Sequence, residues 1–255
     1  MLADLLGDAP GLDRLRSLLM ERTEGYPFYS EETVQGLVEE GVLEGECGAY
    51  RLTVAVQRIT VLATVQSVIG ARIDRLPAGT KRLLQTASVI GKDFELSLLR
   101  HVTEFEDGAV QQYLATLQGS EFVYEIRLFP DPEYTFKHAL THQVAYEGLL
   151  GDRRREKHAE ILRAMERLFQ DSLEDRLERI VFHAVRGENW EAVHTYGMAA
   201  GRQALAISAS HSAVTAFDHV LQALQKLPET PERLRDAIDT RLALRDALFV
   251  LVDSR

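Results

Sequence analysis

The sequence predicts a mainly α-helical protein with a single β-hairpin near its middle and helical repeats towards its C-terminal end. Apolar residues recur at three-to-four spacing along most of the 255 residues, which is the pattern of amphipathic helices. The period changes to two only around residues 124–128 and 134–136, on either side of a Pro-Asp-Pro turn. From about Asp152 onward the pattern is helical again.

Composition narrows the classes of partner and compartment. The chain is 45% hydrophobic and 27% charged, as in ordinary globular proteins, and its net charge of -10 counts against nucleic acid as the main partner. Cys47 is the only cysteine, so a disulfide framework and a cysteine zinc site are excluded. The sequence holds no apolar run near the roughly 20 residues that span a bilayer, and its start lacks the basic residues of a secretory signal. We therefore expect a cytoplasmic protein with no membrane partner.

The first third of the chain is expected to form three helices and a short strand. A leucine-rich helix from Leu12 ends at Gly25, and Pro27 opens the next helix, which stops at Gly41. A strand is predicted at residues 50–53. Thr64 is a candidate N-cap for a helix that reaches Leu76, and the following Pro-Ala-Gly predicts the first domain boundary.

The middle third has the element order of a winged helix-turn-helix. Helices are predicted around residues 83–90, 94–101 and 110–117, then the hairpin, and then a helix that starts near His138 and runs through residue 149. Winged helices often bind DNA, but the candidate recognition helix offers glutamines and threonine in place of positive charge.

The last part of the chain resembles a tetratricopeptide (TPR) array. Trp190 opens a predicted helical hairpin in which small residues alternate with aromatics, and Pro228 closes it, as in repeats of roughly 34 residues. Trp190 and Tyr196 are expected to fill the groove between the helices. No polar cap is evident around residues 248–250, so the array is expected to continue in a longer protein.

Four stretches, in this order and spacing, resemble one family. They are residues 23–32 (TEGYPFYSEE), 64–76 (TVQSVIGARIDRL), 83–91 (LLQTASVIG) and 136–150 (FKHALTHQVAYEGLL). Together they resemble the STAND-class signalling ATPases that are fused to bacterial class III adenylate cyclases and to large transcriptional activators. The resemblance implies a P-loop domain that binds ATP or ADP with magnesium, followed by a helical lid, a winged helix and a TPR-like sensor arm.

The resemblance also implies three nucleotide-contacting positions in the full-length protein. Gly25 and Pro27 match a Gly-x-Pro motif of the lid, whose proline lies near the base. His138 matches a winged-helix histidine that reaches the β-phosphate of ADP and holds the closed, inactive state. Tyr26 departs from the asparagine usual in the family, which leaves the detailed contacts of the lid open.

The chain itself carries no G-x-x-x-x-G-K-[ST] motif, so we expect no ATP hydrolysis and assign no catalytic residue. The predicted division is residues 1–76 as a lid remnant, 77–158 as a winged helix and 159–255 as a truncated arm. The expected function is the regulatory part of a nucleotide-switched ATPase, with the upstream P-loop domain and a protein or small ligand on the arm as partners. The output domain of that ATPase is left open, an adenylate or guanylate cyclase among the options.

Three alternatives stay open at this point. One is a DNA-binding winged-helix regulator with a helical dimerisation arm. Another is an enzyme that holds a metal with His138 and His142, although no third ligand is evident. Finally, residues 153–155 (three arginines) form either a phosphate-binding patch or a solvated helix face beside Glu156 and Glu160.

Overall fold

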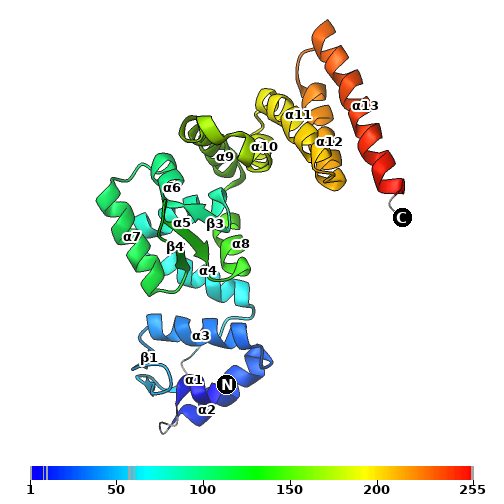
Figure 1. The fold of residues 1–255 in the computed structure, drawn as a ribbon. Helices are drawn as coiled ribbons and strands as arrows, with labels where there is room; N and C mark the ends of the chain where they lie inside the picture. The colour runs from blue at the N-terminus through cyan, green and yellow to red at the C-terminus, as the bar shows by residue number, and fades with distance from the viewer. Residues whose placement is uncertain (1, 8, 10, 57–58, 60, 254–255) are drawn as a thin grey trace. The chain divides into compact units, whose positions relative to one another are not determined.

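The computed structural model of the protein is mainly helical, as the sequence predicts, and describes residues 2–7, 9, 11–56, 59 and 61–253 (Figure 1). Within these residues it contains thirteen α-helices and two small antiparallel sheets. None of the described helices is both long and apolar enough to cross a membrane.

The chain forms two compact units that are interleaved along the sequence. Unit 1 comprises Met1–Ser88, Gln111–Tyr124 and Thr135–Gly148. Unit 2 comprises Val89–Val110, Glu125–Tyr134 and Leu149–Arg255. The division into residues 1–76, 77–158 and 159–255 stays a prediction.

Unit 1 begins with a small helical layer that has its own apolar core. Its elements are α1 (Leu2–Leu6), α2 (Leu12–Thr23), α3 (Pro27–Glu39), β1 (Leu43–Glu44) and β2 (Arg51–Leu52). The core consists of leucines from the three helices together with Val34, Leu43 and Tyr50. The sequence predicted α2, α3 and β2. It did not predict α1 or the partner strand β1, which pairs antiparallel with β2 so that Leu43 faces Leu52.

Gly7 and Gly48 allow the loop before β2 to pack closely against the end of α1. Gly7 has a φ of 83°, and a Cβ at this position would lie 2.1 Å from the carbonyl oxygen of Gly48. A side chain is therefore excluded both by the left-handed backbone and by the close approach of the loop that precedes β2. The backbone N–H of Gly48 in turn donates to the carbonyl of Leu5 at 2.8 Å, which fastens the loop to α1.

Helix α4 (Val65–Arg75) starts as predicted and α5 (Ala78–Ile90) starts earlier than predicted. The Thr64 hydroxyl accepts from the backbone N–H of Ser67 at 3.2 Å and caps α4. We expected Pro77, Ala78 and Gly79 to mark a domain boundary, and Ala78 and Gly79 lie in the first turn of α5. Gly79 is needed there for packing, because a Cβ would lie 2.5 Å from the phenol ring of Tyr113.

The remaining segments of unit 1 pack against α4 and α5. They are the C-terminal half of α7 (Asp107–Gly119), the start of β4 (Val123–Arg127), the end of β5 (Glu133–Phe136) and α8 (Ala139–Glu147). The predicted hairpin is therefore present. Helix α8 ends at Glu147, two residues before the predicted Leu149. Phe122 and Phe136 are fully buried in this unit.

Unit 2 opens with a strand where a helix was predicted. Residues 93–95 form β3 (Asp93–Glu95), and α6 (Leu96–Val102) begins only at Leu96. The sheet order is β3-β5-β4, so β3 lies on the far side of β5 from its hairpin partner. Phe94 is fully buried and stacks on Tyr134 of β5 with ring centroids 5.8 Å apart, which explains why this residue joins the sheet.

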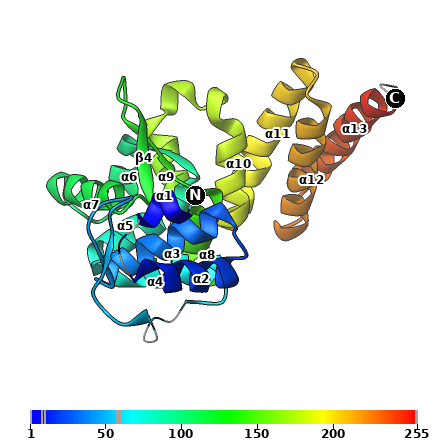
Figure 2. The same ribbon diagram turned by 90° about the horizontal axis from the view of Figure 1, so that it is seen from below.

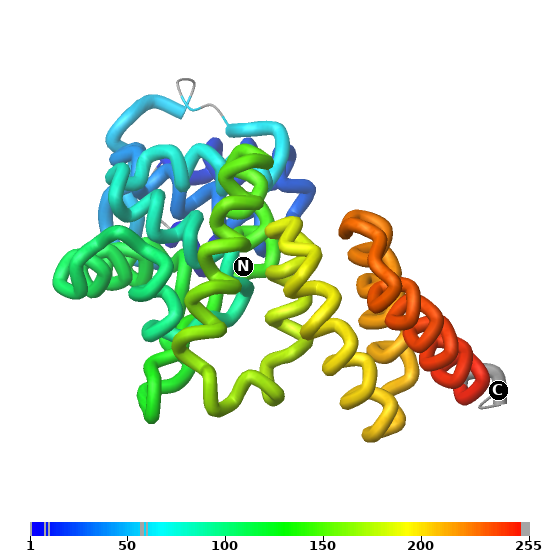
Figure 3. Tube along the Cα trace, turned by 90° about the horizontal axis from the view of Figure 1, so that it is seen from above, coloured from blue at the N-terminus to red at the C-terminus, as the bar shows by residue number. Residues whose placement is uncertain are grey.

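The rest of unit 2 is a series of helices in which each contacts the next. They are α9 (Gly151–Leu168), the short 3-10 turns η2 (Gln170–Ser172) and η3 (Glu174–Arg176), α10 (Leu177–Arg186), α11 (Trp190–Ala206), α12 (Ser210–Lys226) and α13 (Pro231–Asp253). Figures 2 and 3 show α11, α12 and α13 side by side. Helices α11 and α12 approach closely because α11 carries Gly197 and Gly201; a Cβ at Gly201 would lie 2.4 Å from the ring of Phe217.

Candidate functional site

Gly25 and Pro27 lie in the tight turn that joins α2 to α3. Glu24 and Gly25 both have left-handed backbones, with φ of 50° and 72°, and Pro27 is the first residue of α3. A buried hydrogen bond between two hydroxyl groups spans this turn, with Thr23 Oγ1 2.9 Å from Ser30 Oγ. The start of α3 therefore has a defined position.

His138 lies at the N-cap position of α8, where β5 gives way to the helix, and its side chain makes no capping hydrogen bond. Its ring packs against Phe28, the residue after Pro27, with centroids 4.2 Å apart. Its Nε2 atom is buried and has no hydrogen-bond partner among the described residues. The structure thus brings the Gly-x-Pro turn and His138 together within unit 1, from segments that are far apart in the sequence.

Burial is the main influence on the charge of His138. Desolvation lowers the pKa of the imidazole below its ordinary value of 6.5, although the carboxylate of Glu32 opposes the shift. The ammonium of Lys137 acts in the same direction as burial. At neutral pH His138 is therefore a neutral imidazole that can donate or accept one hydrogen bond at its free nitrogen.

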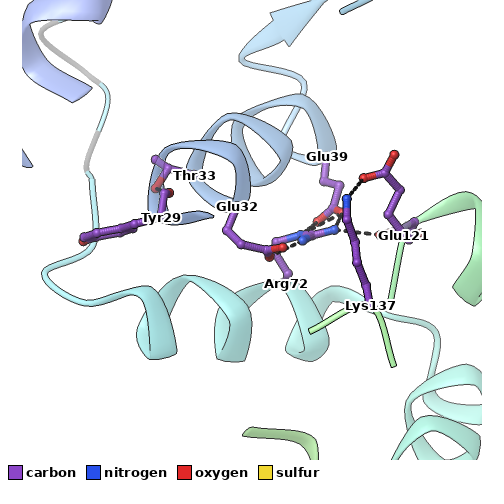
Figure 4. Close-up of polar contacts among 8 residues, drawn as sticks. Tyr29, Glu32, Thr33, Glu39, Arg72, Glu121 and Lys137 are labelled. Carbon is purple, nitrogen blue, oxygen red and sulfur yellow. Dashed lines mark hydrogen bonds and ion pairs between the residues drawn. The ribbon is translucent and has the colours of Figure 1, made fainter. Parts of the chain in front are cut away.

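Arg72 of α4 forms the centre of a buried ion network (Figure 4). Its guanidinium donates to Glu32, and to Glu39 through Nε at 3.0 Å and Nη2 at 2.6 Å. Both carboxylates come from α3, two turns apart. Because the Arg72 residue is only 2% exposed and Glu32 only 5%, each charge depends on the other for its solvation.

Two further contacts extend the network to the segment that follows α7. Arg72 Nη2 donates to the carbonyl of Ser120 at 2.8 Å, and the guanidinium lies 4.7 Å from the centroid of the Phe122 ring. Desolvation lowers the pKa of Arg72, but the two glutamates outweigh it and the net pKa is raised. Arg72 is therefore charged at every pH at which the protein folds.

Lys137 links this network to His138. The Lys137 ammonium donates to Glu121, and its backbone N–H donates to the carbonyl of Phe122 at 3.0 Å. Burial lowers the pKa of Lys137, but the hydrogen bond and charge of Glu121, together with Tyr124, outweigh burial and raise the pKa overall. Figure 4 shows the Lys137 side chain beside the Arg72 guanidinium, with its ammonium turned towards Glu121. Lys137, which contacts the Arg72 network, and His138 are therefore adjacent residues of one backbone segment.

The acidic side chains beside Arg72 are held in ion pairs. The two carboxylates are engaged by Arg72, so neither is free to act as a base. Cys47, the single thiol, is exposed. No group of three or more His, Cys, Asp or Glu side chains that could hold a metal occurs among the residues searched, which are those the structure describes.

His138 and His142 do not form a pair. His142 Nε2 lies 2.8 Å from the carbonyl of Ser88, and its ring packs edge-on against Phe136 with centroids 5.1 Å apart. The two imidazoles therefore have separate surroundings, although they are one helical turn apart in sequence. This arrangement gives no support to the metal-enzyme alternative.

The arginine run at residues 153–155 belongs to the outer face of α9. Arg153 lies 3.6 Å from Glu156, and Arg155 lies 3.1 Å from Asp152, with all four side chains substantially exposed. Internal pairs on a solvated helix thus account for the two outer arginines.

Arg72, Glu32 and Glu39 were not identified from the sequence. One signal was present, because Arg72 falls on the apolar face of its helix, between Ile69 and Ile73. A cation at that position needs buried anionic partners. The sequence alone does not say which of the chain's acidic residues supply them.

Comparison of the chain with known protein families, with curated proteins and with solved structures gave no match.

Proposed function

We propose that this chain is the regulatory part of a nucleotide-switched signal-transduction ATPase that acts in the cytoplasm by domain rearrangement and protein–protein contacts. In this proposal residues 1–76 are the lid, residues 77–158 a winged helix and the remaining residues a TPR-like arm. The order α5, α6, α7 and then the β4–β5 hairpin supports the winged helix. The start of α12, 33 residues after that of α10, supports the repeat.

The observation that carries the proposal is the contact between Phe28 and His138. A latch between lid and winged helix requires the Gly25–Pro27 turn and the histidine to come together, and this contact places them side by side. A buried imidazole nitrogen without a partner is costly unless another state of the protein supplies one. The β-phosphate of ADP, held by a P-loop domain that this chain lacks, has the acceptor oxygens to do so.

The packing also sets a condition on this latch. His138 Nε2 is buried in the present arrangement, so a phosphate oxygen reaches it only after the surrounding side chains rearrange. Arg72 keeps α3 in place during that change, because both of its glutamates lie on α3 beyond Phe28.

Calorimetry tests the proposal directly. ADP and ATP would each be titrated, with magnesium, into this chain and into a form extended upstream to a P-loop domain. We expect binding only by the extended form, and a weaker affinity for ADP in its His138→Ala variant by about tenfold, the value of one charge-assisted hydrogen bond. His142→Ala is the matched control, since His142 bonds to Ser88 and lies outside the latch. Equal ADP affinity in the extended protein and its His138→Ala variant would contradict the latch.

The DNA-binding alternative has weaker support. The same helix-and-hairpin order occurs in DNA-binding winged helices, but α7, the candidate recognition helix, contains Asp107 and neither lysine nor arginine. Duplex binding that weakens steeply between low and physiological salt would revive this alternative, because phosphate contacts release counterions. Absence of binding at low salt would end it.

A further inference from the structure

Strand β4 is an open edge of the three-stranded sheet. The sheet order β3-β5-β4 leaves one side of β4 without a neighbouring strand among the described residues. At the base of the hairpin the Phe122 carbonyl accepts from the backbone N–H of Lys137 at 3.0 Å, so this carbonyl points towards β5. Because backbone groups alternate in direction along a strand, the N–H and C=O groups of Glu125 and Arg127 point to the open edge. An edge with free donors and acceptors can bind another strand.

The side chains around this edge are exposed and largely apolar. Ile126 in β4, and Leu128 and Phe129 directly after it, are each more than half exposed. Isolated exposed apolar residues are ordinary on a protein surface, whereas three within four residues at a sheet edge indicate a contact surface.

The charged residues of β4 indicate which strand fits this edge. Glu125 and Arg127 lie on one face of β4, because each is one residue from Ile126 and successive side chains alternate. Charges on an edge strand often repel an incoming strand. Here the two charges have opposite sign and lie symmetrically about Ile126. A second, antiparallel β4 centred on Ile126 therefore places each Glu125 opposite Arg127 of the other copy.

The other registers that keep the faces matched are less favourable. Centring the pair on Glu125 or on Arg127 places like charges directly opposite each other. Arg127 Nη2 also lies 3.3 Å from Glu133 in its own chain. A guanidinium has five N–H donors, so it can bind a second carboxylate without losing the first.

We propose that β4 pairs antiparallel with β4 of a second copy of this chain, centred on Ile126, and joins two three-stranded sheets into one continuous sheet. In this register Glu125 and Arg127 of facing copies exchange backbone hydrogen bonds and form two ion pairs related by a two-fold axis. Two five-residue strands bury less surface than the roughly 1,600 Å² of a standard interface, so the dimer is expected to be weak and concentration-dependent. The pairing is independent of the nucleotide latch, and its test uses no nucleotide.

Sedimentation velocity of the full chain, from about 1 to 500 μM, measures the association. We expect monomer at the low end of this range and dimer at the high end. Glu125→Arg and Arg127→Glu, each alone, turn both ion pairs into like-charge pairs and should weaken the dimer by at least about tenfold. Arg202→Glu makes the same charge change as Arg127→Glu at an exposed position of α11, and it should leave the association unchanged.

Two combinations test whether the partner is a second copy. The double variant Glu125→Arg with Arg127→Glu restores opposite charges in the same register and should dimerise like the wild type. An equimolar mixture of the two single variants should also dimerise, because one copy then carries two cations and the other two anions at the facing positions. Only folded edges can regain pairing in the mixture, so this result separates a loss of pairing from a loss of folding.

Three results would overturn the proposal. A wild type that stays monomeric at the highest concentration would leave the edge to a different protein. Failure of both the double variant and the mixture to dimerise would exclude the register centred on Ile126. A dimer that neither single variant weakens would place the contact on another surface of the chain, such as the exposed face of α13.

Discussion

At the scale of single residues, Arg72 shows how a buried charge can define a helix pair. A guanidinium that is 2% exposed is stable only because Glu32, Glu39 and the Ser120 carbonyl replace its water. The pair of α3 and α4 can therefore adopt only the register in which these groups meet. In the proposed switch this fixes the distance between the Gly25–Pro27 turn and the rest of the lid.

Loss of Arg72 should destabilise α3 and α4 far more than loss of a neighbouring surface arginine. Arg72→Ala leaves Glu32 buried and unpaired, so we expect the opening free energy of α3 amides, measured by hydrogen exchange, to fall by about 3–5 kcal/mol. Arg75, which pairs with Glu40 at the surface, is the control, and Arg75→Ala should cost less than about 1 kcal/mol.

Removal of the carboxylates should restore the opening free energy that Arg72→Ala removes. The triple variant Arg72→Met, Glu32→Gln and Glu39→Gln carries no buried charge, and we expect it to recover most of the lost opening free energy. Equal losses in Arg72→Ala and Arg75→Ala would show that the network contributes only as a surface ion pair.

The buried pair of His158 and His183 in unit 2 predicts a loss of stability in mild acid. Their Nδ1 atoms are 2.9 Å apart, so one ring donates and the other accepts, which requires the accepting ring to be neutral. Burial lowers the pKa of His158 to about 4, and burial with the neighbouring His158 and Arg179 lowers that of His183 to about 3. Because both folded pKa values lie below the unfolded value of about 6.5, the unfolded chain takes up protons first as the pH falls.

Stability of α9 and α10 is therefore expected to be complete above about pH 6.5 and to fall by about 1.4 kcal/mol per histidine for each pH unit below it. Urea unfolding followed by circular dichroism at pH 7, 6 and 5 measures this slope. The variant His158→Gln with His183→Gln should have a flatter profile across the same range, while exposed His211→Gln should follow the wild type. A wild-type profile that stays flat from pH 7 to pH 5 would exclude a neutral pair.

At the scale of elements, the close approach of α11 and α12 depends on glycine. A Cβ at Gly201 would lie 2.4 Å from the Phe217 ring, which is itself fully buried and cannot move away freely. Gly201→Ala should therefore lower the free energy of unfolding by about 1–3 kcal/mol, although alanine favours a helix. Gly119→Ala in α7 meets no atom within 4 Å and should be neutral or slightly stabilising. Thermal melts of the two variants make the comparison, and equal melting temperatures would contradict it.

The elements that the sequence predicted correctly are those with local signals. Thr64 caps α4, Pro27 opens α3, and Gly91, with a φ of 152°, follows the last residue of α5 as its terminator. Each signal acts within one turn of helix, so it can be recognised without knowing the fold.

The elements that were missed depend on distant partners. Phe94 and Glu95 were predicted to be helical, but Phe94 stacks on Tyr134 and the Glu95 carboxylate pairs with Arg176 at 2.7 Å and Arg179 at 3.0 Å. These interactions stabilise a strand that its own three residues do not specify. The candidate site divides in the same way. His138 and the Gly25–Pro27 turn lay within a recognisable motif, whereas the pairing of Arg72 with α3 is a tertiary contact over more than 30 residues.

At the scale of the whole molecule, the chain order does not coincide with the compact units. Unit 1 takes Met1–Ser88 and then two later segments, Gln111–Tyr124 and Thr135–Gly148. The partners of Arg72 and Phe28 in these later segments are Ser120, Phe122 and His138. By contrast most contacts among α10, α11, α12 and α13 join helices that are adjacent in the chain.

This difference predicts which pieces of the chain fold alone. A piece ending at residue 88 keeps Glu32, Glu39 and Arg72 but lacks the Ser120 carbonyl and the Phe122 ring that complete the burial of the guanidinium. We expect it to show little amide dispersion by NMR, whereas a piece ending at residue 148 regains those groups and should show protected amides in α3 and α4. A piece from residue 173 to the end keeps all contacts among α10, α11, α12 and α13, most of which join helices adjacent in the chain, and should fold on its own with helical circular dichroism and a cooperative melt. Equal stability of the pieces ending at residues 88 and 148 would contradict this prediction, because it would show that the later segments are not needed for unit 1 to fold. In that case the latch would have to be a contact that forms after the lid is already stable.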